Sequence, residues 1–372
     1  MKLVIAGGGT GGHLFPGIAV AEAWRQRAPA PEVAFVGTKG GIEARILPDS
    51  PFPLYTIEIG GIKGKSTVEK IRNILKIPAS LWASLRLLGR LAPDVVLGVG
   101  GYASGPVVLA AWLRRIPCAI QEQNTHPGLT NRILAHFADR IFLAFEPEGS
   151  PFPPKKCIVT GNPIRQTLLS PPTAAQKEER GFTLLVFGGS QGARRINEAI
   201  IEILPQLAAR GVRIIHQTGR TDYERVAQAY RDTGIPDGIA TVTPFIDQMA
   251  QAYSTADLIV CRSGATTIAE LTAIGRPAIL VPYPHAAYDH QEKNARRLLE
   301  KGAARMILDR ELTGKRLLDE ILSLLESPET LRRISENAHS LGHPEAADAI
   351  VEALLPLAAQ RQGITEGAAH EA

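Results

Sequence analysis

A glycine-rich turn near the start of the chain is the first place where residue types and spacing point to chemistry. Residues 2–6 form an apolar run, and GGGTGGH and a helical pattern follow it. Gly7, Gly9 and Gly12 satisfy the G-x-G-x-x-G spacing of dinucleotide-binding turns. That function also needs an acidic residue at the end of the second strand, where this chain has VGT at 36–38. No Lys-Ser/Thr pair follows the glycines, which excludes a P-loop. The turn therefore predicts close approach of an anionic group at a helix start, with an unliganded tight turn as the alternative.

His13 follows these glycines directly, at the start of the predicted helix. Parallel α/β sheets place their ligands at the carboxyl ends of strands, and His13 stands at such an end. The positive end of a helix favours the neutral imidazole, which can accept a proton as a general base. We therefore interpret His13 as a candidate base, against the alternative of a structural histidine.

A second polar constellation follows a strand in the second half of the chain. Ser263 and Gly264 turn the chain, and a helix begins with Thr266 and Thr267 near its start. The N-terminal amides of this helix offer a second anion site. Glu270 lies in the same helix and is unfavourable beside a bound diphosphate unless it accepts hydrogen bonds from a diol such as a ribose. The alternative is an ordinary acidic residue that the helix dipole favours.

The chain contains no D-x-D carboxylate pair. A nucleotide-sugar enzyme without that pair must neutralise its leaving diphosphate with helix ends and a cation such as Arg165. We therefore expect a grip on phosphate that needs neither a metal nor a cofactor. The loop PYPHAAYDHQ follows a buried strand, and its His285, Asp289 and Gln291 can reach sugar hydroxyls.

The elements that must position these residues are predicted by apolar runs that alternate with helical patterns. Continuous runs rich in Val, Ile and Leu predict parallel strands covered on both faces, as in open doubly wound α/β domains. The expected strands are residues 2–6, 32–37, 94–100, 118–123 and 140–145 in the first half, and 183–189, 213–219, 239–245, 258–262 and 277–284 in the second.

Two such domains are expected, because 372 residues exceed the size of one ordinary core. The segment GNPIRQTLLSPPTAAQKEERGF has the prolines and charges of a linker. The predicted domains are residues 1–164 and 165–341, and each has a strand-glycine-helix turn, AGGGTGGH in the first and FGGSQGAR in the second. Residues 359–372 lose the apolar period and are expected to form a flexible tail.

Composition and charge exclude several classes of protein. The formal net charge of +4 shows no nucleic-acid footprint. Cys118, Cys157 and Cys261 lack metal-ligand spacing and indicate free thiols in a reducing compartment. Because the first strand begins at residue 2, we expect no signal peptide. No apolar run reaches the ~18 residues of a membrane span.

Residues 70–90 combine apolar side chains at helical spacing with basic residues. On pattern alone this is a core-facing helix with a solvated basic face. The segment AAWLRRIP adds Trp112 beside Arg114 and Arg115, a combination that suits a lipid head-group interface. The candidate membrane contacts are Ile74, Leu75, Leu81, Trp82, Leu85 and Trp112.

Seven motifs, in order, carry a family resemblance. The chain resembles the bacterial N-acetylglucosaminyltransferases of peptidoglycan precursor synthesis in GGTGGHLFPGIAVAE, GVGGYASGPVVLAA, QEQNTHPGLTNR, TGNPIR, FGGSQGARRIN, PFIDQMAQAYSTADLIVCRSGATTIAE and HQEKNA, which span residues 7 to about 297. One glycine motif would be a weak indication, whereas seven in the same order are specific. The resemblance implies a GT-B fold, with two Rossmann-like doubly wound parallel-sheet domains that face a cleft. It also implies that a C-terminal helix, residues 342–358, packs back onto the first domain.

The resemblance also implies a reaction. GlcNAc moves from UDP-GlcNAc, with inversion, to the 4-hydroxyl of MurNAc in undecaprenyl-pyrophosphoryl-MurNAc-pentapeptide (lipid I), giving lipid II. The implied enzyme is peripheral at the cytoplasmic face of the cell inner membrane and serves cell wall biogenesis, cell shape and cell division. Its partners would be UDP-GlcNAc, lipid I, an anionic membrane surface and other cell-wall synthesis proteins, with no nucleic acid. A polyprenyl substrate favours the interfacial interpretation of residues 70–90.

Three alternatives to this function stay open. Two are other UDP-sugar enzymes of the same fold, a glycolipid glycosyltransferase and a UDP-GlcNAc 2-epimerase. The third is a catalytically silent scaffold that binds lipid or nucleotide.

Residue roles carry over from the family at the matching motifs. His13 matches the family's proposed base, and Glu122, in a motif implicated in acceptor handling, competes with it. Glu270 is expected on the ribose, and the backbone of Ile246 near the uracil edge. The first glycine turn would face the lipid-linked diphosphate and the reacting centre, while the second domain holds UDP. The implied contacts to UDP-GlcNAc are Thr10, Gly11, Gly12, Asn124, Arg165, Ser190, Ile246, Ala265, Thr266, Thr267, Ile268, Ala269, Glu270 and Gln291.

Overall fold

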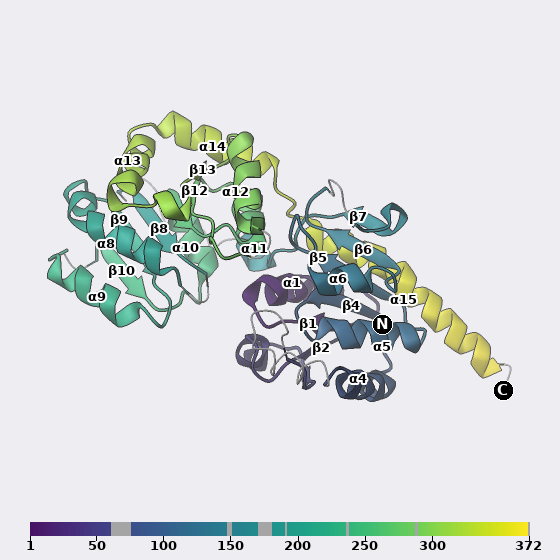
Figure 1. Ribbon diagram of the computed structural model, residues 1–372. Coiled ribbons are helices and arrows are strands. Elements are labelled where there is room, and N and C mark those ends of the chain that lie inside the picture. The colour runs from purple at the N-terminus through teal and green to yellow at the C-terminus, as the bar shows by residue number, and fades with distance from the viewer. Residues whose placement is uncertain are drawn as a thin grey trace. The chain divides into compact units, whose positions relative to one another are not determined.

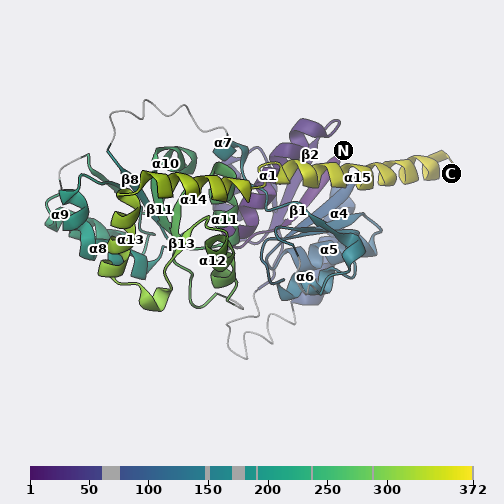
Figure 2. The ribbon, with the colours of Figure 1, turned by 90° about the horizontal axis from the view of Figure 1, so that it is seen from above.

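The structure is a computed structural model that describes residues 1–60, 76–146, 151–169, 181–189, 192–235, 238–286 and 289–370 (Figures 1 and 2). The chain divides into two compact units. Unit 1 comprises Met1–Arg165 and His343–Ala372, and unit 2 comprises Gln166–Gly342. Each unit contains its own parallel sheet.

Unit 1 is built on a seven-stranded sheet in the order β3-β2-β1-β4-β5-β6-β7, in which every neighbouring pair is parallel. Its strand order reverses between β1 and β4, and doubly wound sheets bind their ligands outside the carboxyl ends of strands at such a point. The strands are β1 (Lys2–Gly7), β2 (Glu32–Gly37), β3 (Leu54–Thr56), β4 (Val95–Gly100), β5 (Cys118–Glu122), β6 (Arg140–Leu143) and β7 (Cys157–Val159).

Alternate strand residues of unit 1 enter two separate cores. Leu3 and Ile5 belong to the core that includes residues of α1 and α15, whereas Val4 and Ala6 belong to the core that includes residues of α4 and α5. Figure 1 shows these helices. This period of two is the reason that the strands are apolar without interruption. The helices of this unit are α1 (Gly11–Arg27), α2 (Glu43–Ile46), η1 (Leu47–Asp49), α4 (Ile77–Leu91), α5 (Ser104–Leu113), α6 (Leu129–Leu134), η2 (Pro154–Lys156) and α15 (Ala346–His370).

The C-terminal helix α15 belongs to unit 1 and packs against α1 (Figure 2). Its Ile350, Val351 and Leu354 are fully buried in the core under α1. At the end of α1, Arg27 donates to Asp348 over 2.7 Å and to Glu352 over 2.8 Å. The backbone of α15 stays helical to His370, beyond the point where the apolar period ends. Residues such as Ala, Gln, Arg and Glu sustain a helix without a buried face. The flexible tail that was expected at residues 359–372 is therefore helical as far as His370.

Unit 2 is built on a six-stranded parallel sheet in the order β10-β9-β8-β11-β12-β13. The order reverses between β8 and β11. The strands are β8 (Thr183–Phe187), β9 (Arg213–Gln217), β10 (Ala240–Thr243), β11 (Leu258–Cys261), β12 (Ala278–Leu280) and β13 (Arg305–Met306). The helices are α7 (Gln166–Leu169), α8 (Arg194–Ala209), α9 (Tyr223–Asp232), α10 (Met249–Thr255), α11 (Ala265–Ile274), α12 (His290–Glu300), η5 (Asp309–Glu311), α13 (Gly314–Leu325) and α14 (Pro328–Ser340).

The ten strands expected from the apolar runs are all present. The sequence pattern missed β3, β7 and β13, which have three, three and two residues. All three are edge strands with one neighbour and partly exposed side chains, so they need no long apolar run. The cysteines are free thiols, as expected. Over the described residues, no helix is both long enough and apolar enough to cross a membrane.

Candidate functional site

The backbones of two turns touch at the carboxyl ends of β1 and β4. The amide of Gly8 donates to the carbonyl of Gly100 over 3.3 Å. A Cβ on Gly7 would overlap that carbonyl, and one on Gly101 would overlap the carbonyl of Gly8. The glycine-rich sequence predicted that some group approaches this backbone closely, and the turn after β4 is one such group. The contact holds the first glycine turn at the switch point of unit 1.

His13 lies in the first turn of α1 with its ring against the turn that follows β4. Its Nδ1 is 3.1 Å from the hydroxyl of Thr10, and a Cβ on Gly100 would lie 2.6 Å from its Cδ2. Thr10 occupies the cap position of α1 but makes no side-chain cap hydrogen bond. When Nδ1 carries the ring proton and donates to Thr10, Nε2 keeps the lone pair that a general base needs.

Glu122 ends β5 and is buried, with 2% of its surface exposed. Its Oε1 accepts from the amide of Asn124 over 3.0 Å and from the Asn124 side chain over 3.2 Å. Its Oε2 accepts from the amide of Gly128 over 3.0 Å and from the side chain of Asn131 over 2.9 Å. Both oxygens already hold donors, so this carboxylate organises the loop after β5, including Asn124.

Arg165 is the last residue of unit 1 before the chain enters unit 2. Its guanidinium carbon lies 4.3 Å from the centroid of the Phe15 ring, a cation-π distance. A Cβ on Gly11 would lie 3.0 Å from the same ring. The structure thus places Arg165 beside the first glycine turn, as a fixed positive charge near Thr10–Gly12.

The N-terminus of α11 lies at the switch point of unit 2. Gly264 occupies its cap position and has no side chain that could satisfy the first helical amides. The Ser263 hydroxyl donates to the carbonyl of Gln291 over 2.8 Å, which ties this turn to the start of α12. The side-chain oxygen of Gln291 accepts from the amide of Tyr283 over 3.0 Å. Ala265–Thr267 therefore form a helix start of the kind that suits an anion, with Gln291 close by. The amide of Ile268 already donates to the carbonyl of Gly264 over 2.9 Å.

Glu270 lies one turn further into α11 and is 6% exposed. Its Oε2 accepts from the hydroxyl of Tyr253 over 2.9 Å, and Tyr253 in turn packs edge-on against Phe187, with ring centroids 6.0 Å apart. Burial raises the pKa of the Cys261 thiol, and the negative charge of Glu270 raises that pKa further. The carboxylate is therefore held at the end of β11, and Tyr253 fixes its orientation.

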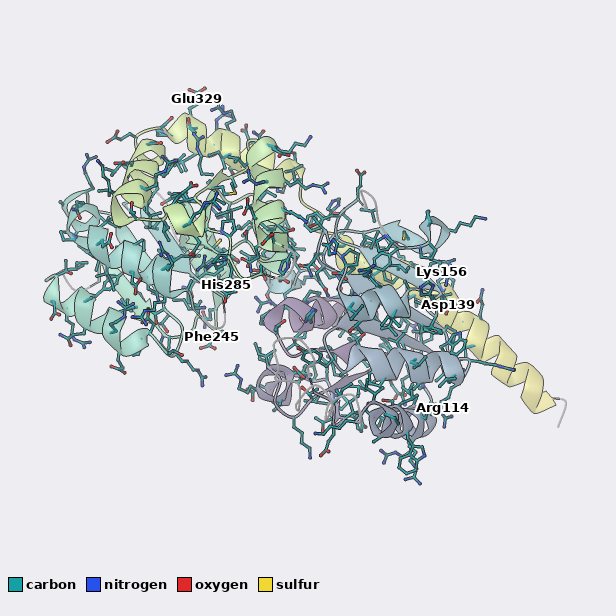
Figure 3. All side chains as sticks on the ribbon, in the orientation of Figure 1. Arg114, Asp139, Lys156, Phe245, His285 and Glu329 are labelled. Atoms are coloured by element: carbon teal, nitrogen blue, oxygen red, sulfur yellow. The ribbon has the colours of Figure 1, made fainter. Side chains whose placement is uncertain are left out.

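Gln217, the last residue of β9, joins two further loops of unit 2. Its side-chain nitrogen donates to the carbonyl of Gly189 over 2.9 Å, and its oxygen accepts from the amide of Ile246 over 3.1 Å. The amide of Ile246 is thus used inside the protein, which leaves its carbonyl as the backbone group for a ligand. In Figure 3, Phe245 and His285 mark the loops after β10 and β12, and both loops leave carboxyl ends of the sheet. Ser190 lies outside the described residues.

Gln217 lies outside the seven motifs, and Tyr253 lies within the motif that begins PFID but was not expected to have a role in the site. Their roles come from contacts made across unit 2, which no local spacing encodes. The one sequence signal for Gln217 is that it is a polar residue at the end of a buried strand. Among the residues that the structure describes, no group of three His, Cys, Asp or Glu side chains is arranged to hold a metal ion.

A buried network lies behind the turn that follows β9. His216 Nδ1 is 3.0 Å from the Tyr230 hydroxyl, and its Nε2 is 3.0 Å from the side-chain oxygen of Asn197. Asn197 donates to the carbonyl of Thr218 over 3.0 Å and to Asp222 over 2.6 Å. Burial lowers the pKa of His216 to about 3, although the charge of Asp222 opposes this effect. The network fixes Thr218, which follows Gln217.

The candidate membrane residues of unit 1 divide into two groups. Trp82 on α4 and Trp112 on α5 are 57% and 46% exposed. The guanidinium of Arg86 lies 3.9 Å from the centre of the Trp82 ring. Leu81 and Leu85 are half-buried and pack against the core beneath α4. Ile74 and Leu75 lie outside the described residues.

Other apolar and basic side chains lie on or next to helices α4, α5 and α6. Arg114 donates to the carbonyl of Leu85 over 2.7 Å and so joins the end of α5 to α4. Figure 3 labels Arg114 and another basic residue of unit 1, Lys156. Other exposed apolar residues on α4, α5 and α6 are Ile77, Leu113, Leu129 and Ile133.

Comparison with known proteins covers both units. The glycosyltransferase family 28 N-terminal domain matches residues 3–143, and the glycosyltransferase family 28 C-terminal domain matches residues 183–350. A protein of Syntrophus aciditrophicus called UDP-N-acetylglucosamine--N-acetylmuramyl-(pentapeptide) pyrophosphoryl-undecaprenol N-acetylglucosamine transferase is 50% identical over 359 residues, 96% of this chain and 99% of that protein. A protein of the same name from Geotalea uraniireducens is 51% identical over 357 residues, 95% of this chain and 97% of that protein.

Solved structures are similar over the same length. The crystal structure of Acinetobacter baumannii MurG matches with a TM-score of 0.71 and 33% identity, and covers 94% of this chain and 98% of its own. The UDP-GlcNAc 2-epimerase from Neisseria meningitidis, bound to UDP-GlcNAc, matches with a TM-score of 0.68 and 16% identity, over 96% of this chain and all of its own. The second likeness extends to the fold alone.

The buried His216 predicts a pH-dependent stability of unit 2. Its pKa is about 3 in the folded protein and 6.5 for a histidine in water, so the unfolded chain binds the extra proton between these values. The contribution of neutral His216 is therefore complete above pH 6.5 and is lost as the pH falls towards 3. The free energy of unfolding should fall by up to about 1.4 kcal/mol per pH unit from this group alone.

Urea unfolding between pH 7 and pH 4.5 measures this slope. A His216→Gln variant should show a shallower slope than the wild type. The matched control is His339→Gln, because His339 is exposed on α14, and it should keep the wild-type slope. Equal slopes for wild type and His216→Gln would contradict the assignment.

Proposed function

The chain belongs to glycosyltransferase family 28, and from that membership and its two-unit GT-B fold we propose that it transfers N-acetylglucosamine to a lipid-linked muramoyl acceptor. The reaction moves GlcNAc from UDP-GlcNAc to the 4-hydroxyl of MurNAc in undecaprenyl-pyrophosphoryl-MurNAc-pentapeptide, and lipid II is the product. The observation that carries this conclusion is identity near 50% with transferases of that name over nearly the whole chain, both units included. The epimerase likeness is one of fold only.

One assay tests the reaction directly. The protein is incubated with UDP-GlcNAc and a short-chain lipid I analogue, and UDP release is followed together with the disaccharide product. We expect UDP release to depend on the acceptor and to equal the product formed. UDP release or sugar epimerisation without acceptor would contradict the proposed function and favour an epimerase.

We propose that unit 2 holds the UDP part of the donor. The N-terminal turn of α11, at Ala265–Thr267, suits the diphosphate, because the positive end of the helix dipole attracts negative charge. Ile268, whose amide already donates to the carbonyl of Gly264, and Ala269 follow in the same motif. Glu270, oriented by Tyr253, is suited to accept hydrogen bonds from the ribose hydroxyls. Ile246 offers its carbonyl to the base edge, since Gln217 occupies its amide.

The other donor contacts are proposed from the family motifs. Gln291 belongs to unit 2, and Ser190 belongs to the FGGSQGAR motif. Thr10, Gly11, Gly12, Asn124 and Arg165 belong to unit 1. Arg165 supplies a positive charge for the leaving diphosphate, and its stacking on Phe15 limits its freedom before the substrate arrives.

We propose His13 as the general base. The acceptor hydroxyl oxygen bonds to the anomeric carbon, the bond from that carbon to the UDP oxygen breaks with inversion, and the hydroxyl proton passes to His13 Nε2. The Thr10 hydroxyl can accept from Nδ1–H, and in that tautomer the lone pair is on Nε2. Glu122 is the weaker candidate, because its oxygens already accept hydrogen bonds within the loop after β5. We assign it to positioning that loop.

A His13→Ala variant should lower kcat by roughly 10²–10⁴-fold, the usual worth of a positioned base, and leave the KM for UDP-GlcNAc nearly unchanged. The acid limb of the pH–rate profile should disappear with the imidazole. Steady-state kinetics with the soluble acceptor measure both effects.

Glu270→Ala is the control that separates donor binding from proton transfer. It should raise the KM for UDP-GlcNAc, because charge-assisted hydrogen bonds contribute about 1.5–3 kcal/mol, and it should keep the acid limb. If His13→Ala retained its kcat while Glu122→Gln lost it, the base would be Glu122.

We propose that α4, α5 and α6 of unit 1 contact an anionic membrane surface, where a polyprenyl acceptor resides. The exposed Trp82 and Trp112 stand beside Arg86, Arg114 and Arg115, and this pairing of aromatic and basic side chains suits lipid head groups. The enzyme would then be peripheral at the cytoplasmic face of the cell inner membrane. Roles in cell shape and division, and contacts with other cell-wall synthesis proteins, would follow from that place.

Replacing both Trp82 and Trp112 with Ser should weaken binding to vesicles that contain anionic lipid by about tenfold or more, because two apolar rings leave the interface. The melting temperature should fall only modestly, since Trp82 is 57% exposed, whereas Trp112 is 46% exposed and contacts the ring of Phe137, with centroids 4.8 Å apart. Vesicle sedimentation at low and high salt measures the binding. Leu85→Ser is the contrast, because Leu85 packs against the core and its loss should lower the melting temperature. Unchanged vesicle binding of the double variant would refute this surface.

A further inference from the structure

A carboxylate of the protein lies inside the first glycine turn. Glu43 is the first residue of α2 and is 1% exposed. Its Oε2 accepts from the amide of Gly9 over 2.7 Å. Its Oε1 accepts from the amide of Thr38 over 2.8 Å and from the Thr38 hydroxyl over 2.9 Å. The side chain thus joins the turn after β1 to the end of β2.

The Glu43 side chain occupies the space that a Cβ would need at three glycines. A Cβ on Gly8 would lie 2.5 Å from the carboxylate, and one on Gly37 would lie 2.6 Å from the Glu43 Cγ. A Cβ on Gly41 would overlap both carboxylate oxygens. The adjacent Gly40 has nothing within 4 Å of its Cβ position. The glycines at these three positions therefore make room for Glu43.

This arrangement is an anion-binding site that is occupied by a carboxylate of the protein, that of Glu43. Backbone amides beside a helix start attract negative charge, and here a buried carboxylate satisfies two of them. A buried carboxylate is costly unless it is hydrogen-bonded, and three donors meet that need. Gly9 precedes Thr10, whose hydroxyl contacts His13, so the carboxylate fixes the backbone from which the base is oriented.

We infer that Glu43 is a positioning residue, the resident anion that holds the first glycine turn in the geometry that His13 requires. This inference rests on the proposed function only for the role of His13. The place of Glu43 among the glycines is a property of the fold and can be tested without turnover.

The test without turnover is a stability cycle at Gly41. In the wild type, Gly41→Ala should lower the melting temperature, because its Cβ meets the carboxylate. In a Glu43→Ala background the same change should lower it far less, since the obstacle is gone. Gly40→Ala is the matched control and should be neutral in both backgrounds. Equal effects of Gly41→Ala in both backgrounds would overturn the inference, whether or not the enzyme turns over.

The test of positioning uses Glu43→Gln and Glu43→Ala in the assay of UDP release. At a temperature where circular dichroism shows both variants folded, kcat should fall about tenfold to a hundredfold, the cost of misplacing a reacting group. The Kd for UDP, measured by calorimetry, should stay within about twofold. A carboxylate with only a structural role would lower the melting temperature and leave kcat of the folded enzyme unchanged, which would overturn the inference.

Formate supplies a further readout. In Glu43→Ala the donors of Gly9 and Thr38 remain and the carboxylate is missing, so added sodium formate should restore part of kcat. In Glu43→Gln the amide side chain fills the same space, and formate should have no effect, as in the wild type. Sodium chloride at equal ionic strength controls for salt. Absence of rescue in Glu43→Ala, or equal rescue in both variants, would overturn the inference. A wild type without transfer would refute the proposed function instead, and the stability cycle would still stand.

Discussion

The contact between the turns after β1 and β4 is the constraint on which unit 1 depends. Gly8 donates to Gly100 there, and neither strand end leaves room for a Cβ on Gly7 or Gly101. Because β1 and β4 are neighbours at the reversal of strand order, this contact fixes the position of the helix start that carries His13. Glu43 holds the same turn from the side of β2. The turn is thereby immobilised from both of its neighbouring strands.

The sequence predicted the parts of the molecule that repeat a local pattern. Apolar runs predicted every central strand, because a strand buried on both faces must be apolar throughout. Glycine spacing predicted the switch-point turn of unit 1, and the helix start after β11 was predicted from its polar turn. The edge strands β3, β7 and β13 were missed because they have only two or three residues and are partly exposed. Contacts such as that of Tyr253 with Glu270 and those of Gln217 escaped because tertiary packing alone brings these residues together.

Glu43, whose carboxylate lies at the end of β2, shows why the rest of the site could not be predicted from local sequence. The sequence has no acid at the end of that strand, and this absence argued against a dinucleotide. In the structure Glu43, five residues after Thr38, returns its carboxylate to the same strand end but turns it towards the glycines. Such a return depends at once on α2, on the nearby Gly37 and Gly41, and on Gly8, which is 35 residues away in the sequence. The same residues that resemble a nucleotide fingerprint therefore serve an internal contact.

The path of the chain has a consequence for how the protein is made. Unit 2 is one continuous segment, Gln166–Gly342, whereas unit 1 is assembled from both ends of the chain. The core under α1 includes Ile350, Val351 and Leu354, which leave the ribosome after all of unit 2. During synthesis from the N-terminus, unit 2 has its complete sequence available while the sheet of unit 1 still lacks one of its covering helices. The inserted unit can therefore fold first, and the host unit must keep an apolar surface shielded until its last helix arrives.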